Sequence, residues 1–309
     1  MKKILTFIAL LLLAVPMLAQ KTYQYATRDT LNLYLDVYQP ADSSCTTFEG
    51  HQKPTIMFVF GGGFVGGNRD HEFLKAWYEH LTKEGYGVVA IDYRLGMKGY
   101  KIGKGLSGAK KASDQFLLSQ EMGVEDVCAA VNYLAQNNVG VDVNNLVLSG
   151  SSAGAIISVA TEYHIVNGDA PELPEGFNFK GVMSFAGGVI STSGKPVFQA
   201  QPCPIAFFHG TADQAVAYEK YERFNRGIWG SAFFDEQFDK KGFHHLIFRF
   251  IGRTHDVAGY MNVLWEVEKN FLEQDVLLGK TRTIDADIID PSLPSWGNIS
   301  VDSIYKRKL

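Results

Sequence analysis

The sequence predicts an α/β domain with a mainly parallel central sheet and helices on both of its faces. From residue 55 onward, short apolar runs typical of buried strands alternate with longer segments whose apolar residues recur at helical spacing. The chain has 309 residues, of which 46% are hydrophobic, so it can bury a large core, and no linker-like segment interrupts it. Its net charge of −4 does not favour a nucleic-acid partner.

Eight strands and five helices are expected in chain order. The first two strands precede the alternation and form an antiparallel lead-in to the sheet. The helix at residues 118–137 carries apolar residues at helical spacing from Val124 to Leu134 and should pack on the sheet, with its Asp126 paired to Arg94. The expected strands lie near residues 22–28, 32–39, 55–60, 87–92, 145–149, 180–186, 204–209 and 245–251, and the expected helices lie near residues 70–84, 118–137, 153–163, 217–227 and 258–278.

The N-terminus has the pattern of a secretory signal peptide over residues 1–19. Lys2 and Lys3 precede an apolar run at residues 4–18, and Ala19 marks a cleavage point. The run is short for a membrane-spanning helix. We therefore expect a cleaved signal peptide, a secreted or periplasmic protein and no stable membrane insertion, with an uncleaved N-terminal anchor as the alternative.

Neither a disulfide scaffold nor a metal site is predicted. The three cysteines, Cys45, Cys128 and Cys203, allow at most one internal disulfide. The sequence contains no H-E-x-x-H motif and no paired C-x-x-C motifs, which are common sources of metal ligands.

The motif G-S-S-A-G at residues 150–154 follows an apolar run at residues 146–149 and leads into a helix of small residues. A G-x-S-x-G motif between a strand and a helix is typical of a nucleophile elbow, a tight turn that exposes a strained serine above the edge of the sheet. Gly150 and Gly154 are needed because side chains there would collide across the turn. Ser152 is therefore the predicted nucleophile.

A glycine-rich loop at residues 61–67 follows an expected strand and has two interpretations. In the first, Gly62 and Gly63 present backbone N–H groups to an oxyanion, because a bare backbone can approach a substrate closely. In the second, the spacing G-x-G-x-x-G is a dinucleotide fingerprint, and Asp92 at the end of the next strand binds a ribose. The first is favoured because other strands come earlier, the chain has an export signal and the Ser152 turn is a ready partner.

A serine nucleophile needs a base and an orienting acid. After a nucleophile elbow, the acid and then the histidine are expected, each just behind a strand. The turn after one downstream strand presents Asp213, and the next strand is followed by His255. Asp256 lies too close to His255 in sequence to orient its ring easily, and His209 is expected to brace the turn of the acid. Asp213 and His255 are therefore the predicted acid and base.

Together these segments resemble the α/β-hydrolase superfamily, and within it the bacterial carboxylesterases of the esterase/lipase type related to the hormone-sensitive-lipase branch. The resemblance implies an α/β-hydrolase fold of about eight strands and a reaction without a cofactor. The site residues that it implies are Ser152 as nucleophile, Asp213 as acid, His255 as base, and the N–H groups of Gly62, Gly63 and Ala153 as the oxyanion hole.

The matching segments follow the family order and span most of the chain. The sequence departs from the family pattern at Phe60, where a histidine is usual, and at residues 96–98, where Ala-Pro-Glu is usual. The matching segments are L-Y-L-D-V-Y-Q-P at residues 33–40, G-G-G-F at 61–64, D-Y-R-L at 92–95, G-S-S-A-G at 150–154, H-G-T-A-D at 209–213 and the turn of His255.

The sequence thus predicts a serine carboxylesterase that acts through an acyl-enzyme. A short exported chain suggests small acyl groups, such as acetyl or feruloyl esters of a plant polysaccharide, although a fold does not set its substrate. Two other classes stay open, namely an exported serine peptidase of the prolyl-oligopeptidase type and a non-catalytic binding module on the same fold. The oligomeric state is not predicted.

The hydrolase domain is expected to cover residues 20–279, with a C-terminal extension over residues 280–309. Residues 96–116 are rich in glycine and lysine, and we expect a mobile loop near the entrance of the site or a solvated surface loop. The aromatic side chains of residues 187–202 and 228–243 either build an acyl or aryl pocket or pack against the body of the domain.

Overall fold

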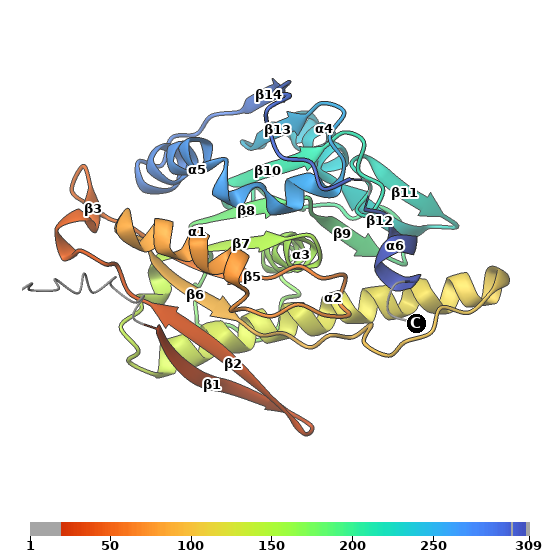
Figure 1. Cartoon of the computed structure of the whole chain (residues 1–309), viewed down its shortest axis with the longest axis horizontal. Helices are drawn as coiled ribbons and strands as arrows, with labels where there is room; N and C mark the ends of the chain where they lie inside the picture. The colour runs from red at the N-terminus through yellow and green to blue at the C-terminus, as the bar shows by residue number, and fades with distance from the viewer. Residues whose placement is uncertain (1–19, 298, 307–309) are drawn as a thin grey trace, which may run out of the picture.

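A nine-stranded sheet forms the centre of the molecule, with the strand order β1-β2-β6-β5-β7-β8-β10-β13-β14 (Figure 1). The structure is a computed structural model, and it describes residues 20–297 and 299–306. The β1–β2 and β2–β6 pairs are antiparallel, and every later pair of neighbours is parallel. The predicted parallel sheet with an antiparallel lead-in is therefore confirmed.

The bounds of the strands are as follows. The central sheet contains β1 (Gln20–Arg28), β2 (Leu31–Tyr38), β5 (Thr55–Val59), β6 (Gly87–Ile91), β7 (Leu146–Ser151), β8 (Gly181–Phe185), β10 (Ile205–Gly210), β13 (Leu246–Phe250) and β14 (Ile284–Ile288). The strands outside it are β3 (Thr47–Phe48), β4 (His51–Gln52), β9 (Gly188–Ser191), β11 (Lys220–Arg223) and β12 (Arg226–Gly230).

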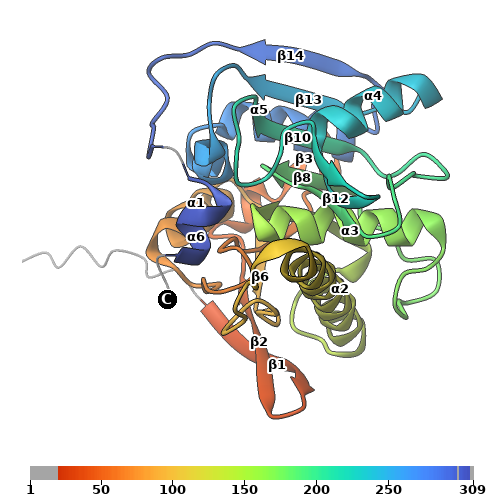
Figure 2. The ribbon, with the colours of Figure 1, turned by 90° about the vertical axis from the view of Figure 1, so that its right-hand side faces the viewer.

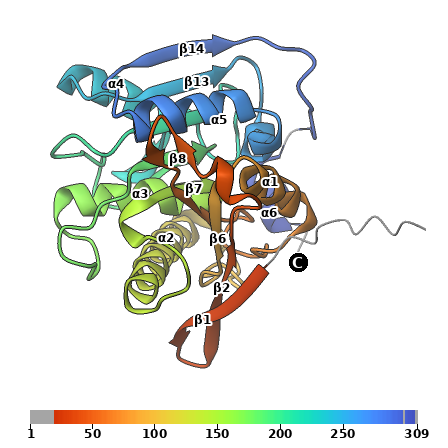
Figure 3. The ribbon, with the colours of Figure 1, turned by 90° about the vertical axis from the view of Figure 1, so that its left-hand side faces the viewer.

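Helices cover both faces of the sheet, as predicted. Helices α1 and α5 lie on one face, and α2, α3 and α4 lie on the other (Figures 2 and 3). In α2, Asp126 accepts a hydrogen bond from Arg94 Nε at 3.0 Å, so the expected ion pair forms. The α-helices of the described residues are α1 (Glu72–Lys83), α2 (Gly105–Gln136), α3 (Ala153–Asn167), α4 (Ser231–Lys241), α5 (Trp265–Phe271) and α6 (Val301–Lys306).

The signal peptide predicted over residues 1–19 lies outside the described residues. Within the described part of the chain, no helix is both long enough and apolar enough to cross a membrane. The three cysteines are free thiols.

The helix predicted near residues 217–227 is wrong, because this segment is a β-hairpin. Strands β11 and β12 pair antiparallel, and β12 also pairs with β9 to complete a second, three-stranded sheet. Phe224 and Asn225 have φ angles of 54° and 60°, which suit a tight hairpin turn. The pairing with β9 is distant in sequence, and it outweighs the local helical preference of the segment.

The loop predicted at residues 96–116 is only partly a loop, because α2 begins at Gly105. Gly108 suggested flexibility in the sequence, but it serves a close contact in the structure. A Cβ at Gly108 would lie 2.2 Å from the carbonyl carbon of Gly103, so the glycine lets the preceding chain cross the first turn of the helix. Gly108 therefore marks close packing here.

Part of the expected C-terminal extension belongs to the central sheet. Strand β14, at Ile284–Ile288, pairs parallel with β13. The guanidinium of Arg249 on β13 binds the carboxylates of Asp285 and Asp287 on β14. The alternation I-D-A-D-I at these positions is typical of a strand with one polar face, and that pattern could have identified it.

The aromatic residues of segments 187–202 and 228–243 pack against the body of the domain. Phe198, Trp229, Phe234 and Phe238 are fully buried, and the ring of Phe198 meets those of Phe234 and Phe238 edge to face at 5.5 and 5.0 Å. Residues 231–241, which were not expected as a helix, form α4, and Phe234 and Phe238 lie on its buried side. These four aromatic residues therefore stabilise the fold and do not line the site.

A buried glutamate in α3 should make the stability depend on pH. Glu162 is fully buried and accepts the backbone N–H of Cys203 at 2.7 Å, and burial raises the pKa of its carboxyl to about 7. Folding raises this pKa. The contribution of Glu162 to the free energy of unfolding is therefore complete below the unfolded pKa of 4.5 and is lost as pH rises through 7.

We therefore expect Glu162→Gln to be more stable than the wild type at pH 8, by about 1–3 kcal/mol, and close to it at pH 5. The glutamine keeps the acceptor for Cys203 and removes the charge. Urea unfolding at the two pH values measures the difference, and Glu175→Gln on the exposed surface is the matched control. A constant difference between the two pH values would contradict the expectation.

Candidate active site

Ser152 lies in a strained turn between β7 and α3. Its backbone has φ 52° and ψ −117°, a conformation that is costly for a residue with a side chain. A Cβ at Gly150 would lie 2.3 Å from the carbonyl oxygen of Gly154, and a Cβ at Gly154 would lie 2.0 Å from that of Val59. Only glycine therefore fits on either side of this turn, as the motif predicts.

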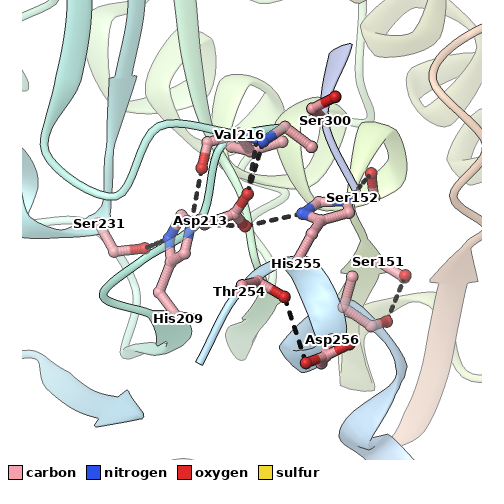
Figure 4. Close-up of polar contacts among 12 residues, drawn as sticks. Ser151, Ser152, His209, Asp213, Val216, Ser231, Thr254, His255, Asp256 and Ser300 are labelled. Carbon is pink, nitrogen blue, oxygen red and sulfur yellow. Dashed lines mark hydrogen bonds and ion pairs between the residues drawn. The ribbon is translucent and has the colours of Figure 1, made fainter. Parts of the chain in front are cut away.

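The structure brings the three predicted residues Ser152, His255 and Asp213 into one hydrogen-bonded row (Figure 4). His255 Nε2 lies 2.7 Å from Ser152 Oγ, and His255 Nδ1 lies 2.7 Å from Asp213 Oδ2. With a proton on Nδ1, the ring donates to Asp213 and accepts from the serine hydroxyl. All three side chains are at most 8% exposed. The three come from loops after β7, β10 and β13, whose carboxyl ends share one edge of the parallel sheet.

Asp213 is held by more than His255. The backbone N–H groups of Ala215 and Val216 donate to its Oδ1 at 2.8 and 3.0 Å. His209 Nε2 lies 3.3 Å from its Oδ2, and the other nitrogen of His209 lies 2.7 Å from Ser231 Oγ (Figure 4). His209 thus braces the turn, as predicted.

Asp213 is therefore a carboxylate at neutral pH. Burial alone would raise the pKa of its carboxyl. The hydrogen bonds from His209 and His255 outweigh this effect and hold the pKa well below its ordinary value. A permanent negative charge therefore faces Nδ1 of His255.

Asp256 does not contact the ring of His255 in this way. Its carboxylate accepts the hydroxyl of Thr254 at 3.2 Å (Figure 4). It also accepts the backbone N–H of Trp296 at 2.8 Å and the hydroxyl of Ser295 at 3.1 Å. Asp256 therefore attaches a distant C-terminal segment to the short helix His255–Asn262, which carries the predicted base.

The glycine loop packs directly on the serine turn. A Cβ at Gly61 would lie 2.9 Å from the carbonyl oxygen of Ser151 and 3.2 Å from Ser152 Cβ. Gly62 and Gly63 have φ angles of 125° and 61°, which favour glycine. The loop therefore lies where its N–H groups can approach a carbonyl bound at Ser152. Ala153 is the first residue of α3, so its N–H is one of the unpaired donors of the helix N-terminus.

The dinucleotide interpretation of this loop also required Asp92 to bind a ribose, and the contacts of Asp92 do not agree with that role. The carboxylate of Asp92 accepts a hydrogen bond from Arg69 Nη1 at 2.8 Å and from the backbone N–H of Tyr34 at 3.2 Å. Asp92 therefore joins the lead-in strands to the sheet and is not presented to a ribose.

Two cavities meet at Ser152. The first has a volume of about 680 Å³ and a mostly apolar wall built by α2, the β11–β12 hairpin and α6. The second, of about 610 Å³, is bordered by His255 and the glycine loop. Apolar residues of the first wall include Leu106, Phe116, Ile156, Ile190, Ile228 and Tyr305, and those of the second include Phe73, Met261, Trp296 and Ile299.

The walls contain residues that the sequence did not single out for the site. Residues 96–116 were expected as a loop near the entrance of the site. The first turns of α2 do line the first cavity, but they are helical. Ile304 and Tyr305 come from the segment that had no predicted role. The apolar and aromatic residues of this segment were a clue, but their pattern does not say which surface the segment covers.

The comparisons with known proteins point to ester hydrolases. Residues 16–168 match the carboxylesterase family. The chain is 26% identical over 176 residues to secreted lipase 1 of Botryotinia fuckeliana, covering 56% of this chain and 27% of that protein. It is 29% identical over 133 residues to chlorogenic acid esterase of Aspergillus niger, covering 42% and 24%. The chain thus spans about a quarter of the length of these relatives.

Among solved structures, the chain resembles a thermophilic esterase of Thermogutta terrifontis with propionate bound. The TM-score is 0.59 at 23% identity, over 84% of this chain and 96% of that one. A puromycin-hydrolyzing peptidase of Mycobacterium tuberculosis has a TM-score of 0.56 at 18% identity, over 88% and 41%. At these identities the likeness shows a shared fold, and it does not separate an esterase from a peptidase.

Proposed function

Since the chain belongs to the α/β-hydrolase superfamily, we propose that it is a serine carboxylesterase that works through an acyl-enzyme. The observation that carries this proposal is the 2.7 Å contact between His255 Nε2 and Ser152 Oγ at the strained turn. The α/β-hydrolase fold predicted from the sequence is confirmed. The relation to the hormone-sensitive-lipase branch stays a prediction.

The proposed reaction uses the row of hydrogen bonds in both directions. His255 takes the proton of Ser152 as Oγ attacks the ester carbonyl, and the charge of Asp213 stabilises the imidazolium. The N–H groups of Gly62, Gly63 and Ala153 bind the developing oxyanion. His255 then protonates the departing alkoxide. A water molecule attacks the acyl-enzyme with the same assistance and releases the acid, so the cycle needs no cofactor.

The two cavities suggest how the ester is oriented. The leaving alcohol must receive its proton from His255, and His255 borders the second cavity. The alcohol therefore occupies the second cavity, and the acyl group occupies the first, which Ser152 and Ala153 border. A volume of about 680 Å³ is within the range that accepts a whole drug-sized ligand. This space favours a feruloyl or medium-chain acyl group over the acetyl group that the sequence also suggested.

A series of p-nitrophenyl esters tests the proposal and the acyl assignment together. We expect kcat/KM to rise by about tenfold or more from acetate to hexanoate, because each buried methylene contributes about 0.8 kcal/mol. The anilide of the same acid should react far more slowly, whereas a peptidase would cleave it efficiently. A fluorophosphonate probe should label the wild type at Ser152, and a binding module would not be labelled. An optimum at acetate would contradict the acyl assignment alone.

Export is also a proposal. The pattern of residues 1–19 is that of a cleaved signal peptide, and two of the matched relatives are named as secreted lipases. A secreted or periplasmic enzyme would meet ester groups on extracellular polymers, so acylated polysaccharide is the natural substrate class to assay first.

A further inference from the structure

The C-terminal segment returns over the active site after β14. Trp296 begins this return. Its backbone N–H donates to the carboxylate of Asp256, and its ring lies 5.7 Å from that of Tyr260. The hydroxyl of Tyr260 also donates to the carbonyl of Pro294 at 2.7 Å. The segment is therefore attached to the same short helix that carries His255.

Beyond Trp296, the segment crosses from the base to the acid and then to the glycine loop. Ser300 pairs with Gln214, the neighbour of Asp213, as an isolated parallel bridge. Helix α6 then lies beside α2 (Figure 1). The ring of Tyr305 meets that of Phe116 edge to face at 5.4 Å. We refer to residues 299–305 as the C-terminal wall.

The wall contacts the glycine loop at Gly63. The hydroxyl of Tyr305 donates a hydrogen bond to the carbonyl oxygen of Gly63. A Cβ at Gly63 would lie 2.8 Å from Ile304 Cγ2, so the isoleucine packs closely on the bare backbone. One polar contact and one apolar contact thus fix the end of the wall against the loop.

The wall lies between the two cavities. Ile304 borders both of them, Tyr305 borders the first, and Ile299 and Ser303 border the second. Its side chains therefore stand between the space that we assign to the acyl group and the space that we assign to the alcohol.

We propose that the C-terminal wall determines acyl specificity, with Ile304 as the partition between the two cavities and Tyr305 as the positioning residue that anchors it to Gly63. This inference rests on the proposed esterase function. With the partition in place, an acyl chain enters the first cavity as a single unbranched or planar group. A branch next to the carbonyl would have to point toward Ile304 and is therefore rejected.

The test compares p-nitrophenyl octanoate with p-nitrophenyl 2-ethylhexanoate, which has the same number of carbons and a branch beside the carbonyl. Ile304→Ala in the full chain should open space for the branch. We expect the ratio of kcat/KM for the linear ester to that for the branched ester to fall by about tenfold, the discrimination that a methylene or two confers in an apolar pocket.

Tyr305→Phe keeps the ring and removes only the anchor to Gly63. The same ratio should fall by about threefold, because one hydrogen bond no longer holds the wall. Ile289→Ala, at a residue that is 79% exposed in the same part of the chain, is the matched control and should leave the ratio unchanged. If Ile304→Ala does not fold, as judged by its melting temperature, Ile304→Val should give a smaller fall in the same direction.

An unchanged ratio in a folded Ile304 variant would overturn the partition, and an unchanged ratio in Tyr305→Phe would overturn the anchor. A general loss of activity with an unchanged ratio would assign the wall a structural role only. Failure of the esterase proposal looks different, because the wild type would then hydrolyse neither ester and would not react with a fluorophosphonate.

Discussion

Ser152→Ala is expected to fold normally and to lose ester hydrolysis by about 10⁴- to 10⁶-fold in kcat, because only the oxyanion donors and substrate binding would remain. The substitution also relieves little of the backbone strain, since alanine at φ 52° is as unfavourable as serine. Stopped assays with p-nitrophenyl hexanoate measure the rate, and thermal unfolding confirms the fold.

The control for this prediction is the neighbouring serine. Ser151 Oγ donates to the carbonyl of Ala258 at 2.5 Å and does not contact His255. Ser151→Ala should therefore stay within about tenfold of the wild type, the loss expected from one hydrogen bond. Fluorophosphonate labelling should persist in Ser151→Ala and vanish in Ser152→Ala. Turnover near the wild-type rate in Ser152→Ala would end the proposed mechanism.

Asp213→Asn is expected to lower kcat by about 10³- to 10⁴-fold and also to lower the stability, because the folded state favours the charged carboxylate. The amide oxygen can still accept the N–H groups of Ala215 and Val216. The amide nitrogen then faces His255 Nδ1, which must become an acceptor, and the ring proton moves to Nε2. In that tautomer the ring can no longer take the proton of Ser152. His255→Ala should reach the loss of Ser152→Ala, because these residues act as a unit.

Asp256→Asn is the matched control for the acid. Its carboxylate binds Trp296, Ser295 and Thr254 rather than the ring of His255. We expect activity within about tenfold of the wild type, since the amide oxygen can replace one acceptor. The pair is measured with one substrate at one pH. A larger loss in Asp256→Asn than in Asp213→Asn would mean that the acid is misassigned.

Much of the fold could be predicted because strong local patterns coincide with the sheet. The strands near Ser152, Asp213 and His255 are buried on both faces and read as short apolar runs bounded by turns. The G-x-S-x-G motif adds a steric requirement that few other turns share. The three predicted residues are therefore found together, although 103 positions separate Ser152 from His255.

The errors arise where distant contacts outweigh local preference. The β11–β12 hairpin has a sequence that suits a helix, and its partner β9 lies far upstream. Gly103 and Gly108 suggested a mobile loop, but their closeness reflects the packing of the chain over the start of α2. In both cases the deciding contact involves a segment that periodicity cannot identify.

The cavity walls were the least predictable part of the site. Leu106, Ile228 and Tyr305 come from α2, the hairpin and the C-terminal wall, and none of them follows a catalytic motif. A residue that only lines a cavity needs an apolar side chain and the right place. Its sequence context therefore resembles that of any core residue.

The position of the C-terminal wall has an evolutionary consequence. The catalytic residues lie in turns directly after buried strands, where a change in one position also disturbs the packing of the core. Ile304 and Tyr305 lie outside the central sheet and are only partly buried, and such positions tolerate substitution better than the core does. Descendants of this chain could therefore acquire new substrates by substitutions in the C-terminal wall, without first losing either the fold or the reaction.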